Sequence, residues 1–380
     1  MTHSPFQQHA RDAVAVARMV ADEAARRGEA LDHDGAFPVA DVEALGRHGL
    51  LAAPLPADLG GAELLAPAGA EALASVLAAI GGGSLPLGRL YEGHVNALAL
   101  ILAYGTREQA RAAAARAGSG HLLAVWNTEA APGLRLVADG PRLRLEGAKI
   151  LASGAGFVRH PLVTARDGAG RLLMVAPDAA GAPADLSGWR AHGMRASASG
   201  RVDFSGVEID AEAIVGADDD YHRQPMFSAG AWRFAAVHFG AMAALFDLAR
   251  DHLVKAGRAD DPHQKARLGT AAIAVETARL WVFSAARRAQ RPNEPAAAVA
   301  YVNLARLAVE RAGLDLLELV HRSVGLSGFM RPHPIERLTR DLATYLRQPA
   351  PDQALTEAAR HLCAAPRPIA EAWRLDDDAP

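Results

Sequence analysis

The spacing of apolar residues changes twice along this chain of 380 residues, and that change limits the folds that the chain can adopt. From about residue 10 to 117 apolar residues recur at three- and four-residue intervals, as in Ala13, Val16 and Val20, which is typical of amphipathic helices. From about 121 to 216 they alternate with polar residues, which is typical of strands. Beyond the acidic segment 218–222 the helical spacing returns. This order predicts a helical protein interrupted by a β-domain.

Two alternating runs in the middle segment predict a β-hairpin. Residues 134–138 and 142–146 alternate around Asp139-Gly140-Pro141, which is a turn sequence. Two further runs, 172–175 and 202–209, predict short strands between turn residues. Short antiparallel strands at this spacing predict a compact barrel or sandwich of roughly 100 residues.

The C-terminal segment contains a long apolar stripe. It runs along residues 302–320 at helical spacing, and the segment 291–295 (Arg-Pro-Asn-Glu-Pro) separates it from the preceding helix. We therefore divide the chain into an N-terminal helical domain of residues 1–120, a middle β-domain of 121–222 and a C-terminal helical domain of 223–380.

Composition and charge exclude several classes of protein. With 43 acidic and 40 basic residues the net charge is -3, which argues against binding of nucleic acid. The one cysteine, Cys363, excludes an internal disulfide framework and cysteine-ligated metal clusters, and the histidines show no metal-ligand spacing. No apolar run reaches the roughly 18 residues of a membrane helix, and no signal-peptide core is present. We expect no metal site, no membrane insertion and a cytoplasmic location.

The informative motifs are five local phrases spread over nearly the whole chain. Phosphate-binding glycine loops and nucleophile elbows are absent. The phrases are Leu55-Pro-Ala-Asp-Leu-Gly-Gly61, Val125-Trp-Asn-Thr-Glu129, Lys149-Ile-Leu-Ala-Ser-Gly154, Gly193-Met-Arg-Ala-Ser197 with the following strand 201–209, and Gly325-Leu-Ser-Gly-Phe329 with Pro334-Ile-Glu-Arg337 and Arg340-Asp341. Together and in this order they resemble the acyl-CoA dehydrogenases. The resemblance implies an α+β multidomain fold with an N-terminal helical domain, a middle antiparallel β-barrel and a C-terminal four-helix bundle.

The resemblance also implies a cofactor, flavin adenine dinucleotide (FAD), bound between the β-domain and the C-terminal bundle. It places the cofactor-binding residues of this chain at Asn127, Thr128, Leu151, Ser153, Arg258, Gln264, Arg322, Gly325 and Gln353. Leu151 stands where the family often has a flavin-stacking tryptophan, and Arg322 where it has a glutamine. Arg258 falls where a family arginine contacts the cofactor of a neighbouring subunit, so the resemblance implies a homodimer or homotetramer.

The usual catalytic base of the family is missing. The position of its glutamate holds Pro349, and the alternative position before Arg233 holds Trp232. Dehydrogenation of an acyl thioester needs a base to remove the α-proton, and neither position holds a carboxylate. Asp352, three residues further on, is the first candidate base, although a helix-capping role is the competing interpretation. Glu92 and His94 of the N-terminal domain are further acid–base candidates.

Three functions remain open from the sequence. The first is an FAD-dependent, acyl-CoA dehydrogenase-like oxidoreductase with a displaced base. Its substrate would be a small molecule such as an acyl-CoA or acyl-carrier thioester, and an electron-transfer partner would reoxidise the flavin. The second is a flavin-dependent monooxygenase of the same fold, which needs no α-proton base. Such enzymes often have a histidine near the missing glutamate, and residues 345–352 contain none. The third is a non-catalytic paralogue that binds flavin or acyl ligands. We rank them in this order.

Overall fold

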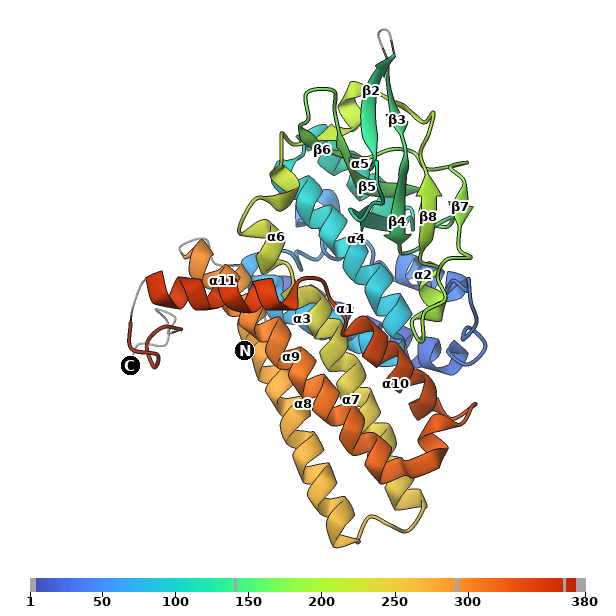
Figure 1. Cartoon of the computed structure of the whole chain (residues 1–380), viewed down its shortest axis with the longest axis vertical. Coiled ribbons are helices and arrows are strands. Elements are labelled where there is room, and N and C mark those ends of the chain that lie inside the picture. Colours follow the sequence, from blue (N-terminus) through green and yellow to red (C-terminus); the bar gives the residue numbers. More distant parts are fainter. Residues whose placement is uncertain (1–4, 140–141, 291–293, 365–366, 374–380) are drawn as a thin grey trace.

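The computed structural model describes residues 5–139, 142–290, 294–364 and 367–373. It shows an α+β fold in which a β-region lies between two helical regions of the sequence, as the change in apolar spacing predicts (Figure 1). The expected turn at 139–141 and the expected break at 291–295 fall partly outside the described residues. In the described part of the chain, no helix is both long and apolar enough to cross a membrane.

The N-terminal region is helical, and side-chain caps define the starts of two of its helices, α4 and α5. Ser84 Oγ accepts the Leu87 N–H at 3.3 Å at the start of one helix, and Thr106 forms a reciprocal capping box with Gln109 at the start of the next. The elements are α1 (Pro5–Arg27), α2 (Val39–Arg47), η1 (Ala57–Leu59), η2 (Pro67–Gly69), α3 (Ala70–Gly83), α4 (Leu85–Tyr104) and α5 (Arg107–Gly118).

The strands of the middle region form two sheets, and not all of their pairs are antiparallel. The larger sheet has the order β10-β6-β5-β2-β3-β9 with β1 beside β5, and the smaller has the order β4-β8-β7. β1 pairs with β5 in parallel, and so does β2 at one position, whereas the other pairs are antiparallel. The expectation of antiparallel pairing is therefore corrected for the pairs of β5 with β1 and β2, whereas closure of the strands into a barrel stays a prediction. The strands are β1 (Leu123–Trp126), β2 (Arg135–Asp139), β3 (Arg142–Glu146), β4 (Ala148–Ala152), β5 (His160–Arg166), β6 (Leu172–Val175), β7 (Ala184–Asp185), β8 (Gly200–Asp203), β9 (Glu208–Ile209) and β10 (Ile214–Val215), with short helical turns η3 (Arg195–Ser197), η4 (Ala211–Ala213) and η5 (Asp220–His222).

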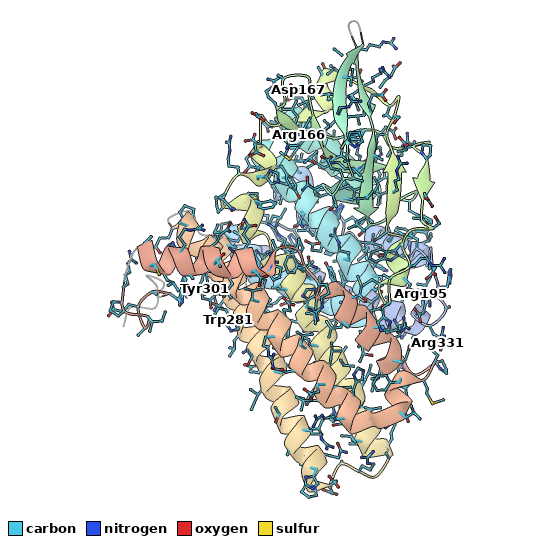
Figure 2. All side chains as sticks on the ribbon, in the orientation of Figure 1. Arg166, Asp167, Arg195, Trp281, Tyr301 and Arg331 are labelled. Carbon is cyan, nitrogen blue, oxygen red and sulfur yellow. The ribbon has the colours of Figure 1, made fainter. Side chains whose placement is uncertain are left out.

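The C-terminal region is built on three long helices that lie side by side, with α10 against α7 and α11 projecting across the start of α9 (Figure 1). Trp281 and Tyr301 join two of these helices, with ring centroids 5.0 Å apart (Figure 2). The elements are α6 (Met226–Ala229), α7 (Trp232–Lys255), α8 (Pro262–Ala289), α9 (Pro295–Val324), η6 (Gly325–Phe329), α10 (Pro334–Tyr345) and α11 (Pro351–Ala364).

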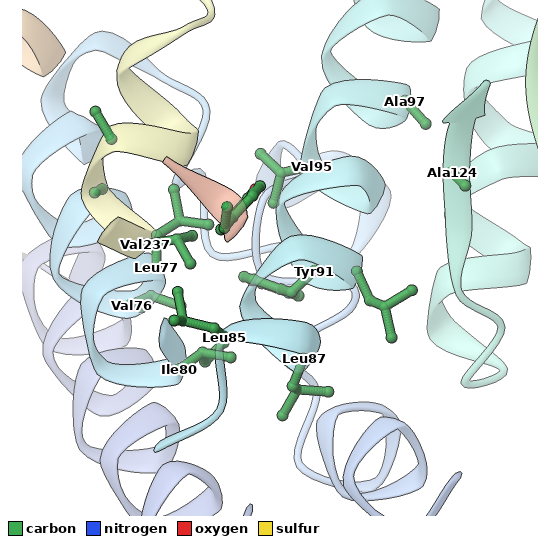
Figure 3. Close-up of a cluster of buried hydrophobic side chains, with 14 of the residues drawn as sticks. Val76, Leu77, Ile80, Leu85, Leu87, Tyr91, Val95, Ala97, Ala124 and Val237 are labelled. Carbon is green, nitrogen blue, oxygen red and sulfur yellow. The ribbon is translucent and has the colours of Figure 1, made fainter. Parts of the chain in front are cut away.

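Two glycines bring the N-terminal and C-terminal helices together. A Cβ atom on Gly240 of α7 would lie 1.8 Å from the Ala78 carbonyl oxygen of α3, and one on Gly81 would lie 2.4 Å from the Val237 carbonyl oxygen. Only glycine permits this backbone approach. Around the crossing, buried side chains of α3, α4 and α7 form one core (Figure 3). The N-terminal helices therefore form a continuous scaffold with the C-terminal ones.

Candidate active site

Two neighbouring cavities lie where α4, the end of β1, β4 and the start of α7 meet the segment after α10. The main cleft has a volume of about 400 Å³ and the side chamber about 210 Å³, and they share part of their lining. The walls of the main cleft include Glu92, Asn96, Asn127, Thr128, Leu151, Ser153, Ser197, Ser199, Tyr345, Arg347 and Pro349. Those of the side chamber include Glu92, Asn96, Phe227, Arg233, Phe234, Asn303, Arg306 and Pro349. The structure thus brings Asn127, Thr128, Leu151 and Ser153 together at one cleft, as the sequence resemblance implies.

A buried lysine fixes the cleft wall at the end of β1. Lys149 Nζ donates to the Asn127 carbonyl oxygen at 3.0 Å, to Thr164 Oγ1 at 2.9 Å and to Glu129 Oε2 at 2.6 Å. Thr164 Oγ1 in turn donates to Asn127 Oδ1 at 2.6 Å. Burial lowers the pKa of Lys149, and the partnership with Glu129 opposes that shift. Asn127 is therefore held by both its backbone and its side chain.

The opposite part of this wall is a row of buried hydroxyl groups. Ser197 Oγ donates to the Met194 carbonyl oxygen at 2.8 Å and lies 2.9 Å from Ser199 Oγ. Ser199 Oγ lies 3.2 Å from Ser153 Oγ. The Trp126 indole N–H donates to the Ser153 carbonyl oxygen at 2.9 Å and orients the turn that follows β4. Three hydroxyl groups that can donate or accept therefore line one side of the cleft.

Strained backbone gathers around the cleft. Leu151 has a φ of 53°, in the left-handed region that a branched residue rarely adopts, and its side chain is 56% exposed. The β4–β8 register shifts between Lys149 and Ala152, on either side of it. Met194, also in the lining, has a φ of 58°, and Ala350, next to the lining, has a φ of 52°. Such strain concentrates at functional sites, where the surrounding structure maintains it.

A charged network from α4 and α7 separates the cleft from the side chamber. Glu92 is only 3% exposed, and its Oε2 accepts from Arg89 Nη1 at 2.5 Å. Its Oε1 accepts from Asn96 Nδ2, and Arg233 Nη1 donates to Asn96 Oδ1 at 2.9 Å. Burial lowers the pKa of Arg233 to about 10, so the group stays charged at neutral pH. Glu92 is thus close to the cleft, but both of its oxygens are occupied. Sequence reasoning named Glu92 but missed Asn96, four positions further along α4, and the contact of Asn96 with Arg233. The second contact joins two helices and leaves no local signal in the sequence.

The candidate base Asp352 lies away from both cavities, and so does Trp232, which stands at the alternative position of the family's base. Asp352 is exposed in the first turn of α11 and lines neither cavity, and Trp232 is fully buried outside both linings. Pro349 lines both cavities, and its carbonyl oxygen accepts a hydrogen bond from Arg306 Nη2. The segment after α10 therefore reaches the cleft, but it brings no carboxylate there.

The histidines near the cleft are structural. His94 is buried, its Nε2 lies 2.8 Å from the Leu51 carbonyl oxygen, and its Nδ1 accepts the Leu123 N–H at 2.9 Å. Burial lowers the pKa of His94 to about 4. His238 packs edge-on against Tyr345, with centroids 4.6 Å apart, and lines neither cavity. The expectation of His94 as an acid–base group is therefore corrected, because backbone groups occupy both of its nitrogens.

The remaining expected cofactor residues lie away from the cleft of the same protomer. Arg258 and Gln264 lie near the end of α7 and the start of α8, opposite to the end of α7 that lines the cavities. A helix of 24 residues is about 36 Å long. With its amide oxygen toward the arginine, Gln264 accepts from Arg258 Nη2 at 2.6 Å and donates to Ser323 Oγ at 3.1 Å. Arg322 and Gly325 lie at the end of α9, and Gln353 is exposed on α11.

This separation decides how those residues can act. None of Arg258, Gln264, Arg322, Gly325 and Gln353 lines the main cleft or the side chamber. If these residues contact a flavin, that flavin must lie in the cleft of a second copy of the chain, as the resemblance implies. The homo-oligomer stays a prediction.

Comparison with known proteins places the chain in a family. Residues 5–121 match the model of the acyl-CoA dehydrogenase N-terminal domain, and residues 223–346 match that of the C-terminal domain. The chain belongs to the acyl-CoA dehydrogenase superfamily.

Individual relatives differ in their activities. The chain is 24% identical to dibenzothiophene monooxygenase of Rhodococcus erythropolis over 97% of this chain and 99% of that protein. It is 25% identical to the probable acyl-CoA dehydrogenase YngJ of Bacillus subtilis (strain 168), over 84% of this chain and 88% of that one. The crystal structure of TdsC from Paenibacillus sp. A11-2 with FMN and indole is similar at a TM-score of 0.82, with 20% identity, over 95% of this chain and 100% of that one.

Proposed function

We propose that the protein is a flavin-dependent monooxygenase that adds one oxygen atom to a small organic substrate. The observation that carries this proposal is the state of the carboxylate at the cleft. Among the described lining residues Glu92 is the one carboxylate, and Arg89 and Asn96 occupy both of its oxygens. Removal of an α-proton needs a free base, whereas oxygen transfer does not. The full-length match to dibenzothiophene monooxygenase supports the same choice over an acyl-CoA dehydrogenase.

The main cleft fits a flavin by the chemistry of its donors. The exposed Leu151 side chain supplies an apolar surface, and Thr128 and the serine row supply hydroxyl groups along one wall. Arg347, which also lines the cleft, is a cation suited to a phosphate group. In TdsC the bound flavin is FMN, so we propose FMN ahead of the FAD expected from the sequence. When bound, a reduced flavin supplies the two electrons that activate oxygen.

The residues of this chain would orient the reacting oxygen atom and limit the access of water to it. The Tyr345 phenol is buried at the cleft beside Arg89 and Glu92, and burial raises its pKa well above the ordinary value. It therefore stays protonated and serves as a hydrogen-bond donor to an oxygen atom in the cleft. Phe227 and Phe234 close the boundary with the side chamber by apolar surface, which limits water at the reacting atoms.

One experiment distinguishes the three functions left open by the sequence. The protein is mixed anaerobically with FMN and octanoyl-CoA, and flavin absorbance is followed. In parallel, chemically reduced FMN is added with indole and then with oxygen, and products are analysed by mass spectrometry. We expect no bleaching by octanoyl-CoA, and an indole product heavier by one oxygen atom. Bleaching by octanoyl-CoA would establish a dehydrogenase instead, and a flavin that binds without either reaction would indicate a non-catalytic protein.

A further inference from the structure

We propose that the side chamber binds an oxyanion group of the substrate, such as a carboxylate, through Arg233 and Asn303, with the apolar body of the substrate directed along the aromatic residues. This inference rests on the proposed function, because it assigns the substrate class of that same site. Its first basis is a buried cation without a direct ionic partner among the described residues.

Arg233 is 6% exposed, and its charge is not neutralised by contact with a carboxylate. Glu92 forms its ion pair with Arg89 at 2.5 Å, and Arg233 reaches Glu92 only through the Asn96 side chain. Its Nε has no hydrogen-bond partner among the residues that the structure describes. A buried guanidinium with an unused N–H donor carries a desolvation cost that a bound anion would offset.

The second basis is another unused donor on the facing helix. Asn303 of α9 is 3% exposed and lines the side chamber, and its Nδ2 has no partner in the described part of the chain. Buried donors without a partner are rare in native proteins, and two from different helices line this one cavity. The pair therefore indicates a ligand that accepts hydrogen bonds from both.

The charge and shape of the chamber define that ligand. Arg306 adds a second guanidinium, 5.6 Å from the centroid of the Phe234 ring, and a hydrogen bond ties it to the Pro349 carbonyl oxygen. Two arginines against Glu92 give the lining an excess of one positive charge. The rest of the wall includes Phe227 and Phe234, and the volume of about 210 Å³ suits a small ring with one head group. A carboxylate can accept two N–H groups from one guanidinium, which a neutral group of the same shape cannot match.

The test compares two probes of the same shape, benzoate and benzamide, by isothermal titration calorimetry on the FMN-reconstituted protein. The wild type should bind benzoate about 10-fold more tightly than benzamide, since hydrogen bonds to a charged group are stronger than those to a neutral one. Arg233→Met should weaken benzoate binding by about 10- to 100-fold and leave benzamide binding nearly unchanged. Arg233→Lys should recover part of the loss. Arg250→Met, the same change on an exposed part of α7, is the matched control and should change neither affinity.

A second variant keeps the test decisive if Arg233→Met fails to fold. Asn303→Leu keeps the side-chain size, and it should also lower the preference for benzoate. Equal affinity of the wild type for both probes overturns the inference, as does an Asn303→Leu or folded Arg233→Met protein that keeps the full preference. These binding outcomes are separate from the function. If the protein transfers oxygen to indole but does not prefer benzoate, the oxyanion site is wrong and the monooxygenase function stands. If it prefers benzoate but transfers no oxygen, the monooxygenase function is wrong and the oxyanion site stands.

Discussion

Replacing Gly240 with alanine tests whether the crossing of α3 and α7 holds the two helical regions together. The added Cβ would lie 1.8 Å from the Ala78 carbonyl oxygen, where ordinary contact begins at 3.4 Å, so the two backbones must separate by more than 1 Å. Overpacking costs about 1–3 kcal/mol, and we expect the upper end because the obstructing atoms belong to the Ala78 backbone and not to a flexible side chain. Alanine regains about 1 kcal/mol of helix propensity. The net loss should be about 2 kcal/mol of the unfolding free energy.

The matched control is Gly269→Ala on the exposed side of α8, where an added Cβ meets nothing within 4 Å. It should stabilise the protein by about 0.5–1 kcal/mol, since alanine restricts the unfolded chain. Urea midpoints measured by circular dichroism compare the two variants with the wild type. The reasoning is refuted if Gly240→Ala is as stable as the wild type, or if both variants shift in the same direction by similar amounts.

Three further changes test the site and its surroundings. Lys149→Met should cost about 2 kcal/mol of unfolding free energy, less than the roughly 3–5 kcal/mol of a fully buried pair because Glu129 is 30% exposed. The same variant should also weaken FMN binding in a fluorescence titration, whereas Lys265→Met on exposed α8 should not. Equal FMN affinity of the two variants would contradict the role of Lys149 in holding the cleft wall. Burial raises the pKa of Asp341 from 3.8 to about 6, so the folded state binds the proton more tightly and stability falls as pH rises from about 4 to 6. At about 1.4 kcal/mol per pKa unit this fall in stability is about 3 kcal/mol, and Asp341→Asn should remove it. If urea midpoints of the variant keep the wild-type dependence on pH, Asp341 is not the group responsible. Asp352→Asn should leave flavin reoxidation unchanged, because Asp352 lines neither cavity, and a slower reaction in stopped flow would restore it as a candidate base.

The sequence predicts the order of helices and strands because apolar spacing is a local property. It does not predict that β1 pairs with β5 in parallel, since the partners Leu123 and His160 are brought together only by the tertiary fold. Four residues that the resemblance assigns to cofactor binding line one cleft, and their contact with a flavin remains a prediction: Asn127, Thr128, Leu151 and Ser153.

Two other expectations show what residue type alone cannot provide. His94 has the chemistry of an acid–base catalyst, but its two ring nitrogens contact backbone groups of distant segments. Arg233 and Asn303 are separated by 70 positions in the sequence, and only the packing of α7 against α9 makes them one donor pair. Burial and unused hydrogen-bonding capacity are properties of the folded chain, so sequence spacing gives no signal for this pair.

The hydrogen bond from Arg306 to the Pro349 carbonyl oxygen bears on how this chain could regain a dehydrogenase's base. The resemblance places the family's glutamate at position 349, and here the backbone of that position is fixed beside a half-buried guanidinium. A carboxylate introduced there would lie within reach of Arg306, and an adjacent positive charge favours the ionised form and weakens it as a base. A glutamate restored at position 349 alone would therefore form an ion pair with Arg306 instead of acting as a base. A return to α-proton removal requires at least two coupled substitutions, the second at position 306.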